Sequence, residues 1–332
     1  MGRAYQELGN LNRDSGNENS SITYYRQACE LNPALLSSWN SLYNYFTKTK
    51  NKPAADHALD QIKTLKSIPA NLLYISQILN EGRLGLAETK CREFLKKNPT
   101  HTYAMSQLAD FASRLGYYDD AEFLLEKATS FEPNDADLRM KYLMVLRKTQ
   151  KFVKTTEQVE ILCKKFPDNL LYQSQKAIEM MQNGDNANAI GVFNEIIKKS
   201  PHNYSALTSK GHAEKTLGKS EDAIKSYQRA YEVKVDHGEA FFSLSNLKTY
   251  AFADRELQIM YSQLERVDLS LREKTYFHFA LAQAYETNKE FDKAFFHFES
   301  GNRIKNNQSK YSIEGMNDEF QAQICLLYTS DA

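Results

Sequence analysis

The feature that most constrains the fold is an even spacing of prolines. The spacing is 34 residues between each of Pro99, Pro133, Pro167 and Pro201, and Pro33 precedes Pro99 by 66 residues, close to two such periods. A fixed period of roughly 20 to 50 residues is typical of repeat proteins, in which each repeat is one supersecondary unit. Glycine and proline are scarce, at 13 and 7 of 332 residues, which favours helices because both residues destabilise helix interiors. The sequence therefore predicts an array of helical hairpins.

Within this period, equivalent positions carry side chains of similar size. If each proline is numbered position 32, position 20 is small and position 24 is large or apolar in every repeat. A small residue where two helices cross closely, followed one turn later by a bulky residue, is what helix packing requires. Position 20 is occupied by Ser21, Ala55, Ala87, Ala121, Thr155, Ala189 and Ala223, and position 24 by Tyr25, Leu59, Cys91, Leu125, Val159, Phe193 and Tyr227.

Glycines mark the expected turns between the paired helices. Gly116, Gly184 and Gly218 fall at position 15, where a left-handed residue would end the first helix. The proline ends the second helix, because it cannot continue a helix and disfavours the helical conformation of the residue before it. This pattern resembles the tetratricopeptide repeat over residues 2–237, as seven repeats. The resemblance implies an all-α fold, a right-handed superhelical solenoid of antiparallel helix pairs.

Residues 238–305 carry two further repeat-like units, which bring the expected total to about nine. The block from Phe241 to Lys305, with its Asn246–Tyr250 segment, resembles the last repeats of bacterial proteins in which a sulfotransferase domain follows a tetratricopeptide array. That resemblance implies a parent protein that transfers a sulfuryl group from phosphoadenosine phosphosulfate. This chain lacks the Gly-x-Pro-Arg-Ser-Gly-Thr-like loop that would hold the phosphates of the donor. We therefore expect no cofactor and no catalytic residue in the chain itself.

The last residues give two expectations about the gene. Residues 306–324 are predicted to be a linker or capping helix towards a missing C-terminal domain. Residues 325–332, Cys-Leu-Leu-Tyr-Thr-Ser-Asp-Ala, match the translation of a transposase end sequence and adapter used in sequencing libraries. We expect this octapeptide to be sequencing read-through.

Composition argues against several classes of function. The chain has 42 Lys and Arg against 42 Asp and Glu, whereas a nucleic-acid or anionic-membrane surface needs an excess of basic residues. No two of the 7 histidines have the spacing of metal ligands on one helix face. The cysteines are far apart, so we expect no disulfide framework, and thiols inside second helices are expected to be buried. The four cysteines are Cys29, Cys91, Cys163 and Cys325.

The sequence therefore predicts a cytoplasmic protein that does not bind nucleic acid, membrane or metal.

The resemblance also implies a binding surface for a protein or peptide. In this family, positions 2, 5, 9 and 12 of the first helix point into a concave groove. Asparagine amides could hydrogen-bond an extended backbone because they both donate and accept, and methionines could give an adaptable apolar contact. The candidate groove residues are Asn10, Arg13, Asn40, Asn44, Tyr103, Asp110, Met144, Arg147, His212 and Lys215.

Three functions remain open at this point. The chain could be the acceptor-binding repeat region of a truncated sulfotransferase, a stand-alone interaction scaffold, or the repeat region of a tetratricopeptide-linked glycosyltransferase. The sequence that follows Ile324 in the intact gene would distinguish them. Binding is the only activity that the residues themselves predict.

Overall fold

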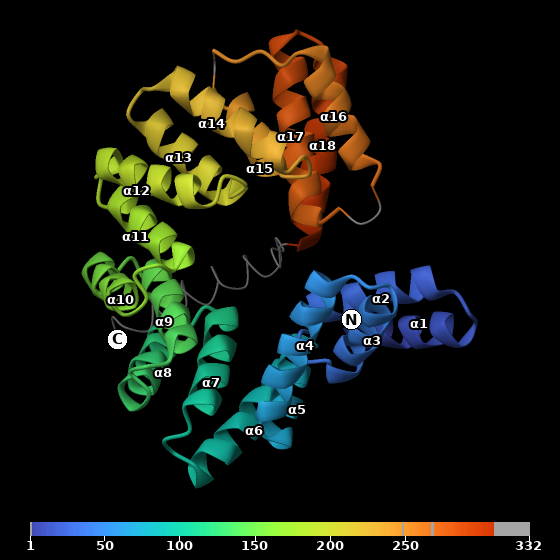
Figure 1. The fold of residues 1–332 in the computed structure, drawn as a ribbon, viewed down its shortest axis with the longest axis vertical. Helices are drawn as coiled ribbons and strands as arrows, with labels where there is room; N and C mark the ends of the chain where they lie inside the picture. The colour runs from blue at the N-terminus through green and yellow to red at the C-terminus, as the bar shows by residue number, and fades with distance from the viewer. Residues whose placement is uncertain (1, 248, 267–268, 309–332) are drawn as a thin grey trace, which may run out of the picture. The chain divides into compact units, whose positions relative to one another are not determined.

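The computed structural model describes residues 2–247, 249–266 and 269–308, and their regular secondary structure consists of eighteen α-helices (Figure 1). The chain divides into two compact units, Met1–Gln158 and Val159–Ala332. The first unit contains α1 (Gly2–Asp14), α2 (Glu18–Leu31), α3 (Leu36–Lys48), α4 (Lys52–Ser67), α5 (Ala70–Asn80), α6 (Leu84–Lys97), α7 (Thr102–Leu115), α8 (Tyr118–Phe131) and α9 (Ala136–Lys148). The second contains α11 (Leu170–Gln182), α12 (Asn186–Lys199), α13 (Tyr204–Thr216), α14 (Ser220–Val233), α15 (Gly238–Ser245), α16 (Asp254–Leu264), α17 (Leu271–Thr287) and α18 (Phe291–Gln308), and α10 (Phe152–Lys165) spans the boundary.

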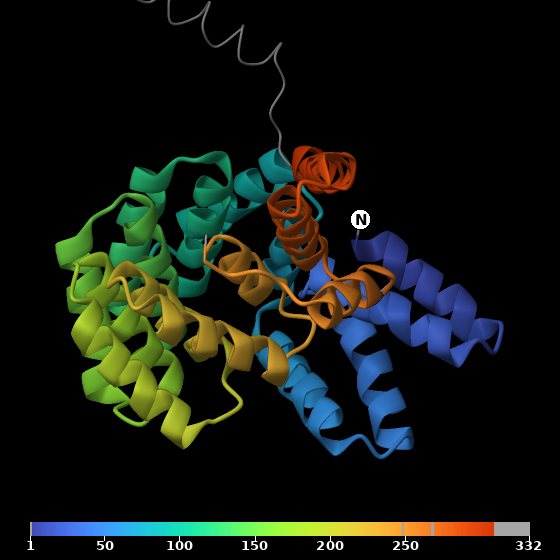
Figure 2. The same ribbon diagram turned by 90° about the horizontal axis from the view of Figure 1, so that it is seen from above.

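Within each unit, consecutive helices pack as hairpins. In the first unit α1 packs on α2, α3 on α4, α5 on α6 and α7 on α8, and in the second α11 packs on α12, α13 on α14 and α17 on α18. The second helix of a pair also packs on the first helix of the next, as α8 does on α9 and α12 on α13. Figure 2 shows the pair α17 and α18 side by side at the red end of the colour scale. The predicted all-α solenoid of helix pairs is therefore confirmed.

The predicted turn position has the predicted backbone. Gly116, Gly184 and Gly218 have φ values of 86°, 85° and 73°, in the left-handed region that glycine enters at no steric cost. The same conformation occurs at position 15 of two repeats that lack glycine, at Lys50 with φ 56° and Gln150 with φ 55°. A left-handed non-glycine residue costs roughly 1 kcal/mol, so the packed hairpin imposes this conformation even where the sequence does not favour it.

The predicted close crossings form the apolar core. Ala121, Ala189 and Ala223 at position 20 have no exposed surface, and Phe193 and Tyr227 at position 24 are equally buried. In the hairpin of α13 and α14, a Cβ atom added to Gly211 would lie 2.5 Å from the Tyr227 ring. The aromatic ring therefore requires a glycine on the facing helix. This is the packing of a small residue against a bulky one that the 34-residue pattern predicts.

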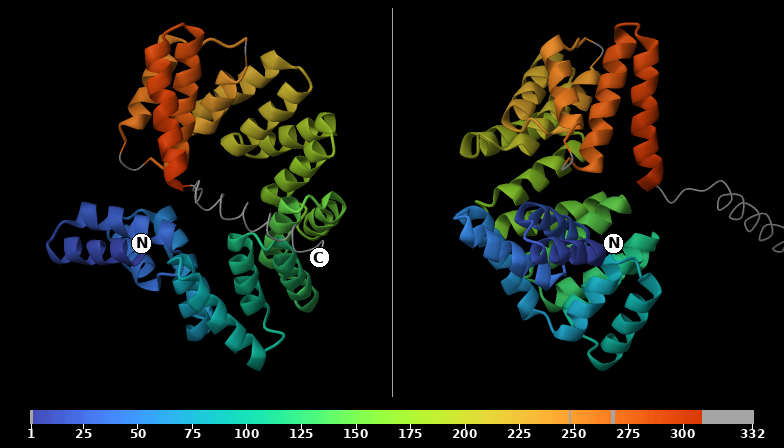
Figure 3. Two further views of the ribbon diagram at one scale, coloured as in Figure 1. Left: turned by 180° about the vertical axis from the view of Figure 1, so that it is seen from behind. Right: turned by 90° about the vertical axis from the view of Figure 1, so that its right-hand side faces the viewer.

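The block that resembles the end of sulfotransferase arrays departs from the hairpin pattern. The short helix α15 packs on α14 and α17, and the segment between α15 and α16 leads to a buried carboxylate, Glu256. Glu256 accepts hydrogen bonds from the hydroxyls of Tyr231, at 2.8 Å, and Tyr250, and from the backbone N–H of Ala253 at 2.9 Å. Tyr250, part of the resembling segment, therefore holds the start of α16. The two orientations of Figure 3 show α16, drawn in orange, beside the α17–α18 pair.

Candidate functional site

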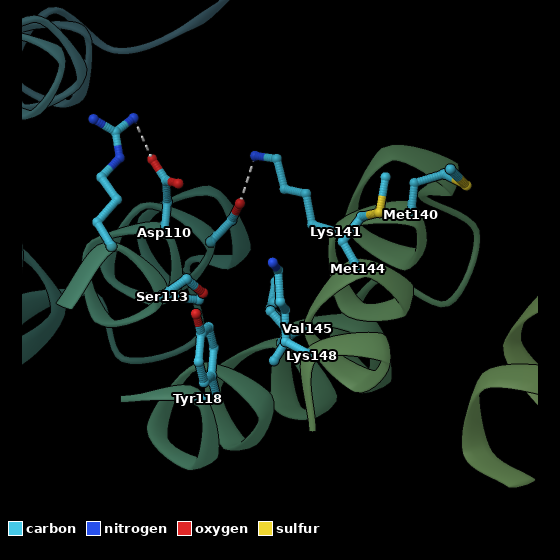
Figure 4. A pocket seen from close by; sticks show the side chains of 12 residues that line it. Asp110, Ser113, Tyr118, Met140, Lys141, Met144, Val145 and Lys148 are labelled. Atoms are coloured by element: carbon cyan, nitrogen blue, oxygen red, sulfur yellow. Dashed lines mark hydrogen bonds and ion pairs between the residues drawn. The ribbon is translucent and has the colours of Figure 1, made fainter. Parts of the chain in front are cut away.

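A cavity of about 400 Å³ lies among α7, α8 and α9 in the first unit. Helices α7 and α9 are the first helices of successive repeats and touch each other directly, and α8 lies between them in sequence and contacts both. We call this cavity the α7–α9 cleft. Figure 4 shows Asp110 and Ser113 on α7 and Lys141 and Met144 on α9 around it. The cleft is thus built from the helices that the repeat pattern assigns to the binding groove.

The inner surface of the α7–α9 cleft is apolar. Ala109 and Leu125 are fully buried there, and Val145 is almost so. Met144 has 53% of its surface exposed, and Met140 lines the same cavity one turn earlier. Unbranched methionine side chains adapt to ligands of different shape. The cleft can therefore bury an apolar side chain of a partner.

Charged side chains surround this apolar surface. Arg114 is held by an ion pair with Asp110 at 2.9 Å and a hydrogen bond to the Asn80 side-chain oxygen at 2.7 Å. Lys141 donates to the Ser106 hydroxyl at 2.7 Å. Lys148 lines the cleft as an exposed cation. Polar groups at the edge of an apolar cavity can orient a ligand by hydrogen bonds.

Two of the predicted groove residues, Asp110 and Met144, line this cleft together. Two others, Arg13 and Asn44, line a smaller cavity of about 210 Å³ among α1, α2 and α3. Asn10 lies nearby on α1, where its side-chain oxygen accepts from the Tyr25 hydroxyl at 2.7 Å. The amide of Asn10 is therefore partly used within the hairpin.

Three further predicted residues of the first unit have other surroundings. The Asn40 amide donates to the Leu36 carbonyl at 2.9 Å, one turn earlier in the same helix. The Tyr103 hydroxyl lies 3.0 Å from the Ser76 hydroxyl and so links α7 to α5. Arg147 is half-buried on α9 and does not line the α7–α9 cleft. A binding role for these residues stays a prediction.

In the second unit, His212 and Lys215 lie on α13. His212 Nδ1 is 2.9 Å from the Tyr227 hydroxyl, and its Nε2 is 3.7 Å from a Glu239 carboxylate oxygen. The hydrogen bond to His212 lowers the pKa of Glu239, which also pairs with Arg272 at 3.3 Å. Lys215 is exposed. The structure therefore connects His212 to a structural network between α13, α15 and α17.

Buried titratable groups fit a packing role. His237 and His297 are buried, and burial lowers the pKa of each to about 4. Burial raises the pKa of the Cys29 thiol to about 12 and that of Cys91 to about 11, so neither thiol is a reactive thiolate at neutral pH. The prediction of buried thiols is confirmed for these two cysteines, whereas Cys163 is only half-buried. Among the described residues, no group of three or more His, Cys, Asp or Glu side chains could hold a metal ion.

Sequence reasoning missed part of the α7–α9 cleft. Several residues of its lining are outside the assumed groove positions. Among them, Arg114 and Lys148 both occupy position 13 of a first helix, and Tyr118 lies on a second helix. Position 13 lies one helical turn after position 9, so it shares a helix face with Asp110 and Met144. A basic residue at position 13 of two successive repeats was the signal that could have identified this edge.

The comparisons with known proteins agree with this architecture. Residues 2–35, 102–135 and 175–239 match the tetratricopeptide repeat, so tetratricopeptide repeats are present in the chain. No curated protein matches the sequence. No helix in the part of the chain that the structure describes is both long and apolar enough to cross a membrane.

Several solved structures share the fold at low identity. A structure of human IFIT1 dimer with m7Gppp-AAAA is 13% identical, with a TM-score of 0.51, and the match covers 92% of this chain and 77% of that one. YrrB, described as a TPR protein with an unusual peptide-binding site, is 16% identical with a TM-score of 0.44, over 55% of this chain and 94% of that one. MamA is 15% identical with a TM-score of 0.44, over 55% and 96%. The likeness to IFIT1 bears on the fold alone. The class is a helical repeat protein that contains tetratricopeptide repeats.

Proposed function

We propose that this chain binds an extended peptide of a partner protein in the α7–α9 cleft. The observation that carries the proposal is an apolar cavity of about 400 Å³ between two first helices, flanked by polar and charged side chains. An apolar side chain of the peptide would enter between Met144 and Val145. Ser113 and Lys141 at the edge would hydrogen-bond its backbone.

The energetics favour an apolar anchor at this site. Burying a leucine- or methionine-sized side chain contributes about 1.5–3 kcal/mol, and the flexible side chain of Met144 can close over it. The polar edge would add orientation more than affinity, because the hydrogen bonds replace bonds to water. Together these contributions suit a peptide that binds reversibly.

The test selects ligands without assuming their sequence. A random 12-residue peptide library displayed on phage is selected against the full chain, and the dissociation constants of the selected peptides are measured by fluorescence polarisation. We expect Met144→Glu to weaken these peptides by about tenfold or more, because it places a charge beside the apolar anchor. Selected peptides that bind the variant as tightly as the original chain would contradict the proposal.

A matched control is available on the neighbouring helix. Phe123 on α8 is 59% exposed, close to the 53% of Met144, and does not line the cleft. Phe123→Glu makes the same chemical change outside the site. Its effect on peptide binding should stay within about twofold, since surface substitutions away from a site are usually small.

The parent protein is a second question, and we propose a sulfotransferase that uses phosphoadenosine phosphosulfate. The proposal rests on the resemblance of the block from Phe241 to Lys305. A further observation is that Phe291, Phe295 and Phe296 on α18 are largely exposed, and an exposed apolar surface of this kind is suited to packing against another structural element. A stand-alone scaffold and a glycosyltransferase are the alternatives.

The intact gene tests this second proposal. Translation beyond Ile324 should reveal a strand followed by a Pro-Arg-Ser-Gly-Thr-like phosphate loop. A stop codon within about one helix length after Ile324 would instead favour the scaffold. Of the predicted linker or capping helix at 306–324, residues 306–308 belong to α18. Residues 309–324 and the predicted read-through at 325–332 lie outside the described residues.

A further inference from the structure

A second cavity, of about 380 Å³, lies among α12, α13 and α14 in the second unit. Here the two second helices provide the walls: Ile190 and Asn194 come from α12, and Lys225 and Arg229 from α14. We call it the α12–α14 cleft. In repeat numbering, Ile190 and Asn194 occupy positions 21 and 25, and Lys225 and Arg229 occupy positions 22 and 26 of the next repeat. The α7–α9 cleft uses positions 5, 9 and 13 of first helices, so the two clefts use different faces of the repeat.

The base of the α12–α14 cleft contains a buried carboxylate that is already neutralised. Glu214 is only 4% exposed, pairs with Lys210 at 3.3 Å and accepts from the Ser226 hydroxyl at 2.6 Å. Position 11 is apolar in most other repeats, as at Ile78 and Leu146. A buried charge is stable only when it is paired and hydrogen-bonded. Glu214 and Lys210 therefore form a neutral pair within the cleft lining.

The remaining charges of the lining are mostly positive. Lys219, Lys225 and Arg229 are exposed and make no ion pair among the described residues, and Asp222 is the one further acid in the lining. Lys225 and Arg229 are one helical turn apart on α14, so both side chains reach the same side of the helix. Two like charges at this spacing destabilise an isolated helix slightly. An anion between them would remove that repulsion.

We propose that the α12–α14 cleft binds a cluster of anionic groups on a segment of a partner protein. The shared chemistry is a carboxylate or a phosphate, supplied by consecutive acidic residues or by phosphoserines. Arg229 can bind either group through two parallel hydrogen bonds, and Lys225 and Lys219 add point charges. The Asn194 amide on the opposite wall can donate a further hydrogen bond.

The dimensions of the site favour a peptide over a nucleic acid. Nucleic-acid affinity comes from many phosphate contacts along a continuous basic surface. This cleft offers three unpaired cations within a confined volume, on a chain whose formal net charge is zero. A short acidic segment of protein matches both the volume and the charge.

The experiment measures binding of three fluorescent probes to the full chain by polarisation. The probes are an octa-glutamate peptide, a peptide with two adjacent phosphoserines, and an eight-nucleotide single-stranded RNA. We expect at least one peptide to bind, and the tighter of the two identifies carboxylate or phosphate as the preferred group. The double variant Lys225→Glu with Arg229→Glu should weaken that peptide by about tenfold or more, as for a directly contacting charged pair.

The matched control is the α18 variant Arg303→Glu with Lys305→Glu. Both residues are exposed and neither lines the cleft, so this variant makes the same change of charge in the same unit. Binding should then fall by less than about threefold, the effect expected from long-range electrostatics alone. An equal loss in the α18 variant and in the Lys225–Arg229 variant would overturn the site, as would binding of neither peptide. Tighter binding of the RNA than of both peptides would overturn the peptide assignment. Circular dichroism of each variant verifies that it remains folded.

Discussion

The α7–α9 cleft and the α12–α14 cleft are similar in volume but opposite in chemistry. Both lie among three consecutive helices of the same type of repeat, at about 400 and 380 Å³. The first places Met144 and Val145 between first helices, whereas the second places Lys225 and Arg229 between second helices. A repeat of two helices thus offers two faces, one formed by the first helices and one by the second. Residues seven or eight positions apart in a helix lie on the same side, so the residues of one face can differ between repeats without changing the other face.

The two repeats also differ at one core position. Position 11 carries Leu146 in the repeat of the α7–α9 cleft and Glu214 in the repeat of the α12–α14 cleft. The apolar residue leaves its surroundings free for aliphatic packing. The carboxylate instead recruits Lys210 and Ser226 as partners. Glu214 lines the α12–α14 cleft, whereas Leu146 does not line the α7–α9 cleft, so the buried acid makes the base of the α12–α14 cleft polar.

The largest expected effect tests whether both units share one repeat register. Ala121→Trp and Ala223→Trp place a large ring at position 20, where both alanines have no exposed surface. We expect each to lower the free energy of unfolding by roughly 3 kcal/mol, because the crossing helices must separate. Urea unfolding of both variants measures this.

The exposed Lys127→Trp on α8 is the control for adding a tryptophan, and it should change stability by less than about 0.5 kcal/mol. If only one of the two alanine substitutions is destabilising, the two units do not share the register.

Acid should affect the two units differently. His237 and His297, the buried histidines of the second unit, have pKa values lowered to about 4. Because the unfolded chain binds protons at about pH 6.5, stability is complete above that pH and falls as the pH drops towards 4. We expect each of the two histidines to cost the second unit up to roughly 2 kcal/mol between pH 7.5 and 5. Amide hydrogen-exchange protection factors, measured separately for α1–α9 and α11–α18, report the stability of each unit.

The same measurement on His297→Gln should show a smaller loss at pH 5, whereas His202→Gln, at an exposed histidine, should behave like the original chain. The first unit contains His57 and His101, neither of which is buried. The first unit also has a buried carboxylate, Glu122, whose pKa is lowered by the ammonium groups of Lys151 and Lys154. The stability that ionised Glu122 contributes is therefore lost only when the pH falls below the ordinary pKa of a glutamate. Equal losses in both units at pH 5 would contradict this account.

Salt should give the smallest effect and the sharpest distinction between the clefts. Raising NaCl from about 50 to 500 mM screens exposed charges, so the anionic peptide should bind the α12–α14 cleft roughly tenfold more weakly. A peptide anchored by an apolar side chain in the α7–α9 cleft should lose less than about twofold, since burial of apolar surface does not depend on counter-ions. Fluorescence polarisation at both salt concentrations measures the two ratios. Similar ratios would mean that the clefts bind by the same kind of interaction.

The sequence by itself determined the repeat, the helix pairs and the crossing points. These depend on interactions between residues close in the chain or in adjacent helices, which a 34-residue period displays directly. The left-handed turn at Gly116 and the buried Ala121 were predictable for this reason. Part of the α7–α9 cleft was also predictable, because Asp110 and Met144 lie at groove positions of successive repeats.

Only the tertiary structure decided which side chains from different helices meet. His278 and His297 are nineteen residues apart, yet their Nδ1 atoms lie 3.0 Å from each other across the α17–α18 pair. The neutralisation of Glu214 by Lys210, and the convergence of Lys225 and Arg229 on the same cleft, likewise depend on three helices lying side by side. Periodicity fixes which face of a helix a residue occupies. The neighbour across that face is fixed by how the helices pack, and this is why the sequence determined the scaffold and the packing determined the sites.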